Sequence, residues 1–298
     1  MFRTKLEDVK GIEEAIVIAG HNFGVDKIPC SYNFNGSLME YEGNYVTVRN
    51  DNGSPLGIVG SRYKVNQPKE TWDFIDKFLS VSNGKIDRGL LFDNGRRIGA
   101  SITLNDREYI RGDRVTHSML IMNSFDGSTS FMGYGLSSRW VCMNQLPHSV
   151  RFFNIKHTTN MDEKIGVARE MLNYYNEGIT DFDDKMKYLV GAPMDNSGAI
   201  AWFKTLIPKP KEDKSQARYE NAISKYNELL VSGKGTEIEG VKGTAYGAMQ
   251  ALTEYVNHHK TIRAKTNELT EEKRFDSTVF GSGNNLMQVG FNSLLQVA

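Results

Sequence analysis

The hydrophobic period of this chain changes once, and that change constrains its fold more than any other feature. Before about residue 160, apolar and polar residues alternate in short runs, most regularly from Ile98 to Leu104. This is the period of a half-buried β-strand. From Ile165 to Leu189 the apolar residues recur at intervals of three and four, the period of an amphipathic helix. Strands followed by helices predict an α+β fold.

Turn residues divide the first part of the chain into strands. Asp51-Asn52-Gly53 and Asp93-Asn94-Gly95 each lie between strand-like runs, and Asn-Gly is the strongest short-range hairpin signal. Further strand-like segments follow at 117–123, 130–135, 138–142 and 150–157, so we predict an antiparallel meander sheet. One helix interrupts the strands and is expected to begin at Pro68 and to end near Ser80, because Pro is favoured in a first helical turn.

The second part of the chain is predicted to be helical. The long helix over 165–189 is expected to lie on one face of the sheet, and two more helices are expected at Gln216–Val231 and Thr244–His259. The tail carries Leu286, Val289, Leu294 and Leu295 and docks either on its own domain or on a neighbouring subunit. We therefore predict an α+β sheet domain over 1–190 and a helical C-terminal region over 191–298, either separate or part of the same domain.

Composition places the chain among soluble globular proteins. Its 298 residues are 39% hydrophobic, and no apolar run reaches the roughly 18 residues of a membrane span. The first residues, MFRTKLEDVKG, lack the apolar core of a secretory signal. Two cysteines, Cys30 and Cys142, are too few for a disulfide framework and fit a reducing compartment. We expect a cytoplasmic protein with no membrane partner.

Charge and aromatic residues together indicate a binding surface in the middle of the chain. The net charge is zero, but residues 85–158 hold 10 Lys and Arg against 6 Asp and Glu. Cations neutralise phosphates and aromatic rings stack on unpaired bases, so we predict that this sheet segment binds single-stranded nucleic acid. The alternative is that its aromatic rings form core and its arginines are solvated. The residues predicted to bind are Arg96, Arg97, Arg139, Trp140, Asn144, Arg151, Lys156 and His157.

Most catalytic motifs are excluded by spacing. Gly233-Lys234-Gly235-Thr236 is no phosphate loop, because Leu229 stands at the first Gly position and Gly follows the lysine. The acidic pairs Asp183-Asp184 and Glu271-Glu272 lie in polar surroundings, and no histidines have metal-ligand spacing, so we assign no catalytic residue, metal or cofactor. One enzymatic alternative stays open, a hydrolase that uses Cys142 with His148 or His157.

Seven segments of the chain carry a resemblance to a known family: 57–59, 63–66, 123–128, 139–144, 151–158, 243–244 and 251–258. They resemble a family of phage- and plasmid-borne proteins, domain of unknown function nine hundred and thirty-two. The resemblance implies an origin in a mobile element of a bacterial host, and it implies no catalytic residues. Asn144-Gln145-Leu146 departs from the Asn-Thr-Leu that family members usually carry there.

Strands followed by one long helix are also similar in architecture to the single-strand annealing proteins of phages, such as Red-beta. We therefore expect a non-enzymatic protein that binds single-stranded DNA and anneals or recombines it as a homo-oligomer in the bacterial cytoplasm. The alternative is an interaction protein that binds or inhibits a host defence factor. The hydrolase is the third hypothesis.

Overall fold

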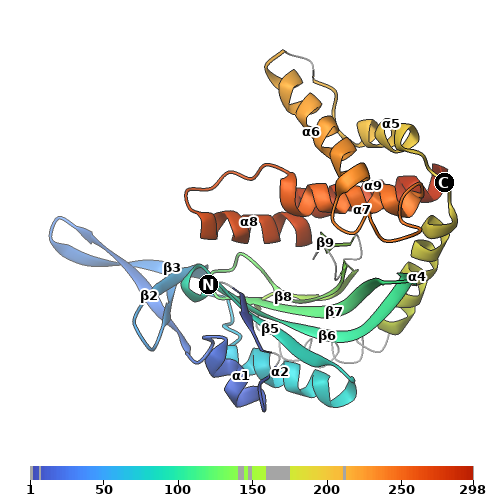
Figure 1. Cartoon of the computed structure of the whole chain (residues 1–298). Helices are drawn as coiled ribbons and strands as arrows, with labels where there is room; N and C mark the ends of the chain where they lie inside the picture. Colours follow the sequence, from blue (N-terminus) through green and yellow to red (C-terminus); the bar gives the residue numbers. More distant parts are fainter. Residues whose placement is uncertain are drawn as a thin grey trace. The chain divides into compact units, whose positions relative to one another are not determined.

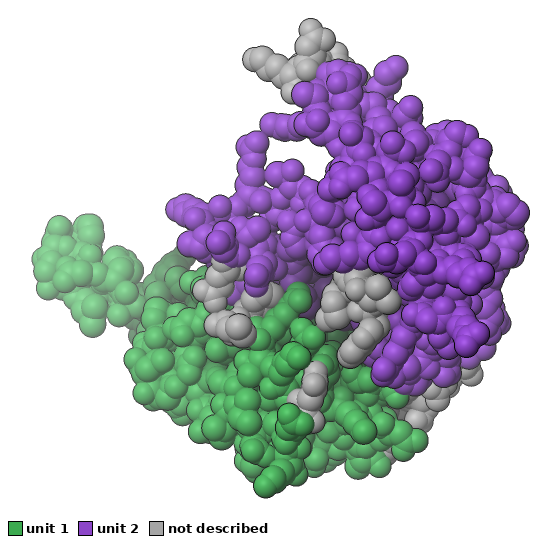
Figure 2. Space-filling model, in the orientation of Figure 1, with its two compact units in different colours: residues 1–104, 118–135, 151–175 green, residues 105–117, 136–150, 176–298 purple. Residues whose placement is uncertain are grey.

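A computed structural model describes residues 3–6, 8–139, 144–146, 150–158, 175–210 and 213–297. It contains an antiparallel sheet and a helical C-terminal region, which confirms the predicted α+β class (Figure 1). The chain divides into two compact units (Figure 2). Unit 1 comprises residues 1–104, 118–135 and 151–175, and unit 2 comprises residues 105–117, 136–150 and 176–298.

The main sheet has seven strands in the order β1-β5-β6-β7-β8-β10, with β9 paired to β8. Consecutive strands β5 to β8 are neighbours, as a meander requires. Strands β6, β7 and β8 contribute residues to both units. The strands are β1 (Arg3–Lys5), β5 (Lys85–Phe92), β6 (Arg97–Ile110), β7 (Asp113–Ser124), β8 (Phe131–Arg139), β9 (Asn144–Gln145) and β10 (Val150–Ile155).

A second sheet of three strands lies in unit 1. It is ordered β2 (Val25–Phe34), β3 (Ser37–Arg49) and β4 (Pro55–Gly60), and both pairings are antiparallel. The turn predicted at 51–53 joins β3 to β4, and the turn predicted at 93–95 joins β5 to β6. Asn94 and Gly95 adopt positive φ angles of 55° and 100°, a conformation that Asn and Gly accept at low cost.

The described part of unit 1 also contains two helices, α1 (Ile12–Ile18) and α2 (Pro68–Val81). Pro68 begins α2 as predicted, and Gln67 and Glu70 form a capping box at its start. The Phe74 ring of α2 packs against Phe131 of β8 and Phe153 of β10, with centroid distances of 5.1 and 5.2 Å. Aromatic packing therefore fixes α2 on the sheet.

Unit 2 is mainly helical. Its helices are α4 (Tyr175–Gly191), α5 (Asn196–Leu206), α6 (Asp213–Ser232), α7 (Ala245–Glu254), the π-turn η3 (Tyr255–His259), α8 (Asn267–Val279) and α9 (Ser282–Val297). Helices α6 and α7 with η3 agree with the two predicted helices, whereas α5 and α8 have no counterpart in the prediction. Residues 165–174 of the predicted 165–189 helix lie outside the described residues.

The buried side of α4 agrees with the predicted apolar stripe. Phe182, Met186 and Leu189 are buried in one core cluster with Ile110 of β6 and Val115 of β7. Helix α9 contributes Met287, Phe291 and Leu294 to the same cluster. Of the two alternatives for the tail, docking on its own part of the chain is the observed one.

The domain boundary near residue 190 stays a prediction, because unit 2 takes residues from both sides of it. In the described part of the chain, no helix combines the length and the apolar character needed to cross a bilayer.

Candidate nucleic-acid interface

Arg96 and Arg97 follow the β5–β6 turn, but both have partners. The exposed Arg96 guanidinium lies 3.2 Å from the Asp93 carboxylate. Arg97 is half-buried, with its guanidinium 4.5 Å from the centroid of the Phe92 ring. A solvated ion pair of this kind is weak, so Arg96 is accessible to an anion, whereas Arg97 is committed to packing.

Arg139 and Asn144 are completely buried in unit 2. Arg139 Nε donates a hydrogen bond to Asp113 Oδ1 at 2.6 Å, and its terminal nitrogens donate to the carbonyls of Lys234 and Gly235 at 3.3 Å. A buried, paired guanidinium offers no surface to a ligand. The predicted roles of Arg139 and Asn144 in nucleic-acid binding therefore do not fit their positions.

Arg151 is exposed at the start of β10, where its Nε donates to the Tyr134 hydroxyl at 2.7 Å. Three other residues of the sequence hypotheses, Trp140, Cys142 and His148, lie outside the described residues. Neither the stacking role of Trp140 nor the hydrolase hypothesis is therefore tested by the geometry.

Lys156 and His157 are the predicted residues that the structure brings together at a cleft. This cleft of unit 1 measures about 660 Å³ and is also lined by Arg62 and Tyr63. The His157 ring stacks on Tyr63 at 4.8 Å and its Nδ1 lies 3.2 Å from the Lys64 carbonyl. Burial lowers the pKa of His157, so its ring is neutral at pH 7, and the exposed cations of the cleft are Arg62 and Lys156.

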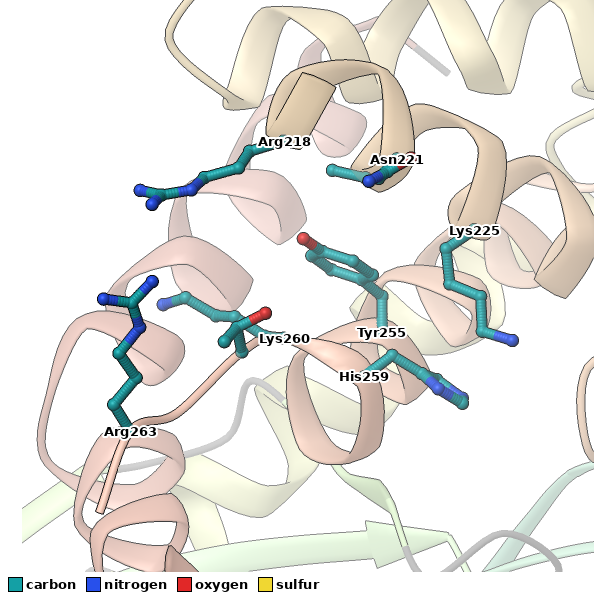
Figure 3. A pocket seen from close by; sticks show the side chains of 9 residues that line it. Arg218, Asn221, Lys225, Tyr255, His259, Lys260 and Arg263 are labelled. Carbon is teal, nitrogen blue, oxygen red and sulfur yellow. The ribbon is translucent and has the colours of Figure 1, made fainter. Parts of the chain in front are cut away.

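A second and more basic pocket, of about 720 Å³, lies in unit 2 (Figure 3). Helix α6 supplies one wall with Arg218, Asn221, Ala222 and Lys225, which follow a three-one-three spacing and so share one helix face. The opposite wall is η3 and the segment after it, with Tyr255, His259, Lys260, Thr261 and Arg263. None of these lining residues is acidic.

The Tyr255 ring stands between the two walls of this basic pocket. In Figure 3, Arg218 and Arg263 lie on the side of its hydroxyl, and Lys225 and His259 lie on the other side. Phe203 supports the ring edge-on at 5.4 Å and itself stacks on Tyr226 at 4.1 Å. Tyr255 is half-buried, so one part of the ring is fixed by packing and the rest stays accessible.

The wall that carries Lys260 and Arg263 is held by backbone hydrogen bonds. Lys260 N donates to the Tyr255 carbonyl at 2.7 Å, which closes the π-turn. Arg274 of α8 donates to the carbonyls of Asn257 and Lys260 at 3.3 and 3.1 Å. Lys273 donates to the Arg263 carbonyl at 3.1 Å. These bonds fix the backbone of the wall and do not use the side-chain nitrogens of Lys260 and Arg263.

At neutral pH the basic pocket holds four permanent cations. Burial, followed by the nearby Lys225 charge, lowers the pKa of His259, so its imidazole is neutral at pH 7. Burial also lowers the pKa of Lys260, whose Nζ donates to Ser282 Oγ at 3.0 Å. Lys225 pairs with the exposed Glu228 at 2.7 Å. Two carboxylates, Glu254 and Glu228, also act on His259, so the four cations of the basic pocket outnumber the nearby anions.

Comparison with known families identifies the chain. The family described as "Domain of unknown function (DUF932)" matches residues 55–279, well over half of the sequence. The chain belongs to the DUF932 family. No match to it was found among the curated proteins or among the solved structures. The basic pocket lies within the DUF932 match, whereas strands β2 and β3 precede it.

Sequence reasoning missed the basic pocket of this DUF932 protein for an identifiable reason. The excess of basic residues lies in the strand-rich middle of the chain, away from the pocket. Arg218 and Lys225 lie on a different face of α6 from its buried apolar residues. Lys260 and Arg263 come after the end of η3. The available signal was the shared face of Arg218, Ala222 and Lys225.

A buried group of polar residues in unit 2 has the composition of a catalytic triad. His117 Nδ1 lies 2.7 Å from Ser137 Oγ, and His117 Nε2 lies 3.2 Å from Asp183 Oδ1. Arg107 and Tyr109 also donate to Asp183, at 3.0 and 2.5 Å. Ser137 has no exposed surface, and a nucleophile must reach its substrate. The group therefore joins β6, β7, β8 and α4 as a hydrogen-bond network.

Among the described residues, no three His, Cys, Asp or Glu side chains are grouped so that they could hold a metal ion.

Proposed function

We propose that this DUF932 protein binds single-stranded nucleic acid without making or breaking bonds, and that the basic pocket of unit 2 is its binding site. The observation that carries the proposal is the convergence of Arg218, Lys225, Lys260 and Arg263 around Tyr255, with no acidic lining residue. Cations of this kind contact phosphates, and an accessible ring beside them stacks on an unpaired base.

The pocket of about 720 Å³ is within the size range of ligand sites. Two of its features favour a single strand over other anions. The two walls place cations on both sides of the Tyr255 ring (Figure 3). A nucleic-acid strand whose base stacks on this ring has phosphates on both sides of that base, and these cations can contact them. Asn221 adds an amide that both donates and accepts hydrogen bonds. In duplex DNA the bases are stacked on each other and offer no face to Tyr255.

The test is fluorescence anisotropy with a labelled oligothymidylate and with the same length of duplex DNA. We expect single-stranded DNA to bind more tightly than the duplex. The Arg218→Ala/Arg263→Ala double variant is expected to weaken binding at least about tenfold, because two phosphate contacts are lost. Tyr255→Leu should weaken it by a similar factor, and Tyr255→Phe, which keeps the ring, should not.

The matched control is Lys187→Ala, which removes an exposed lysine of unit 2 outside the pocket. Its affinity should equal that of the wild type. No binding at micromolar wild-type protein would contradict the proposed function. Undiminished binding by the Arg218→Ala/Arg263→Ala variant, together with a loss in Arg62→Ala/Lys156→Ala, would move the site to the cleft of unit 1.

The alternative hypothesis of a protein that binds a host factor predicts a different outcome. A partner protein would be captured from host lysate after nuclease treatment, and its capture would be insensitive to the Arg218→Ala/Arg263→Ala change. Loss of all partners on nuclease treatment supports the proposed nucleic-acid binding.

A further inference from the structure

The ribbon formed by the outer parts of β2 and β3 is exposed on both faces. Every residue from 31 to 43, which we call the arm, is exposed. Figure 1 shows the arm as a long two-stranded ribbon, and Figure 2 shows it as a narrow lobe that stands away from the rest of unit 1. Asn35 and Gly36 form its tip with φ angles of 51° and 84°.

The pairing of the two strands sorts the arm side chains onto two faces. Tyr32 is opposite Met39, and Phe34 is opposite Ser37, and paired residues of a ribbon project to the same side. Alternation along β3 adds Tyr41 to this apolar face. The exposed fractions on the apolar face are 51% for Tyr32, 62% for Phe34, 46% for Met39 and 55% for Tyr41.

The opposite face is mostly polar. Ser31 pairs with Glu40, and Asn33 pairs with Leu38, while alternation places Glu42 beside Glu40. Such a two-sided pattern is the one expected of a ribbon with one covered face and one solvated face. A two-stranded ribbon alone is marginally stable in water and needs a third element to pack against.

The arm chemistry excludes nucleic acid as the covering partner. Residues 28–44 contain Glu40 and Glu42 and no Lys, Arg or His, so the arm would repel phosphates. The partner must therefore present an apolar face of similar size.

We propose that the arm is a self-association surface, in which the apolar face of one copy packs on the same face of a second copy. Large side chains of this kind each have an area of roughly 200 Å², and about half of it is exposed on the arm. Two arms would then bury about 800 Å² from these four positions alone. With the flanking side chains, this approaches the roughly 1,200 Å² of a small specific interface.

Symmetry and charge also fit a second copy. A two-fold contact joins the same patch on both copies and needs only a self-complementary surface, which a flat row of aromatic side chains supplies. Glu40 and Glu42 point away from the contact, so the association buries no like charges. The arm belongs to unit 1 and the basic pocket to unit 2, so the inference does not rest on the proposed function.

The test is size-exclusion chromatography with light scattering on the full chain without nucleic acid. The wild type is expected at twice the chain mass of 33.6 kDa. Tyr32→Ser/Phe34→Ser and, separately, Met39→Lys are expected at the single-chain mass. Tyr32→Phe, which keeps the apolar face, and the opposite-face control Asn33→Ser/Glu40→Gln should remain dimeric.

Circular dichroism and thermal melting should show that the monomeric variants remain folded. A monomeric wild type at high micromolar concentration would overturn the proposal, and so would dimers of both apolar-face variants. A monomeric wild type that binds neutral vesicles or captures a host protein through Tyr32 and Phe34 would overturn self-association in favour of that other partner. Fluorescence anisotropy with a short labelled oligonucleotide, measured on the same variants, tests binding at the basic pocket independently of self-association.

Discussion

At the scale of single residues, His21 shows how packing sets a protonation state in unit 1. Trp72 Nε1 donates to His21 Nδ1 at 3.0 Å, and His21 Nε2 donates to the Leu90 carbonyl at 2.9 Å. The neutral ring therefore has both nitrogens satisfied. A proton on Nδ1 would face the Trp72 N–H, so two donors would oppose each other in the core. Burial, with a smaller effect of Arg49, lowers the pKa of His21 to about 4.

This lowered pKa predicts a loss of stability in mild acid. Since an unfolded histidine titrates near 6.5, the stabilisation by neutral His21 is fully present above about pH 6.5 and is lost as the pH falls towards 4. The shift corresponds to roughly 3 kcal/mol in the free energy of unfolding. Urea denaturation at pH 7 and pH 4.5 measures it.

The variant for this measurement is His21→Gln, which cannot titrate. At pH 7 it should be less stable than the wild type, because the Trp72 and Leu90 partners lose their fitted ring. At pH 4.5 the difference should shrink. His117 and His157 also have pKa values lowered by burial, so some acid sensitivity remains in the variant. An equal difference at both pH values would show that His21 carries none of the acid sensitivity.

At the scale of elements, the Arg139–Asp113 pair joins four segments of unit 2. Arg139 ends β8, Asp113 begins β7, and the carbonyls of Lys234 and Gly235 belong to the loop after α6. Tyr246 of α7 donates its hydroxyl to the other Asp113 oxygen at 2.8 Å. The pair is fully buried and each partner has further hydrogen bonds, which is the condition under which a buried ion pair is tolerated.

We predict that Arg139→Met destabilises the protein by roughly 3–5 kcal/mol, because it leaves the Asp113 carboxylate buried without its cation. Arg139→Met/Asp113→Asn should recover a large part of that loss, since no uncompensated charge remains. Urea denaturation of the two variants measures both effects. The control is Arg96→Met, which breaks the exposed pair with Asp93 and should cost less than about 1 kcal/mol. Equal costs for Arg139→Met and Arg96→Met would contradict the structural role of the buried pair.

The elements differ in how well the sequence predicts them. Local signals were sufficient for the turns at 51–53 and 93–95, for the start of α2 at Pro68 and for the buried side of α4. The Asn35-Gly36 turn has the same Asn-Gly signal. The strands of the arm around it are exposed on both faces, so no buried residues indicate where these strands begin and end. Arg139 is predicted to bind nucleic acid because it lies in the basic, aromatic middle of the chain, and that pattern does not indicate that Arg139 is buried. Its partner Asp113 and the Gly235 carbonyl are distant in sequence.

The candidate site was harder to predict than the fold for a related reason. Arg218 and Arg263 are far apart in the chain and line the same pocket, one from α6 and the other from the segment after the π-turn at Tyr255. The sequence pattern that predicts binding is local, because it combines cations and aromatic rings within the strand-rich segment 85–158. Of the predicted residues, Lys156 and His157 do line a cleft, yet the cation beside them, Arg62, comes from the loop after β4.

At the scale of the whole molecule, the charge is balanced while the basic pocket is not. Net charge is zero, so long-range attraction for a polyanion is small, and binding depends on the few cations that touch phosphates. The salt dependence of binding therefore reports how many cations take part.

We predict a moderate salt slope for single-stranded DNA. Each phosphate contact to a single strand lowers the logarithm of the association constant by about 0.7 for a tenfold rise in salt. The four permanent cations of the pocket, Arg218, Lys225, Lys260 and Arg263, thus predict a slope of about −3. The Arg218→Ala/Arg263→Ala variant should show about half of this slope, and Lys187→Ala should leave it unchanged. Anisotropy titrations over a range of salt concentrations measure all three. A slope near zero would mean that phosphates are not the contact, and one steeper than about −6 would require many cations outside the basic pocket.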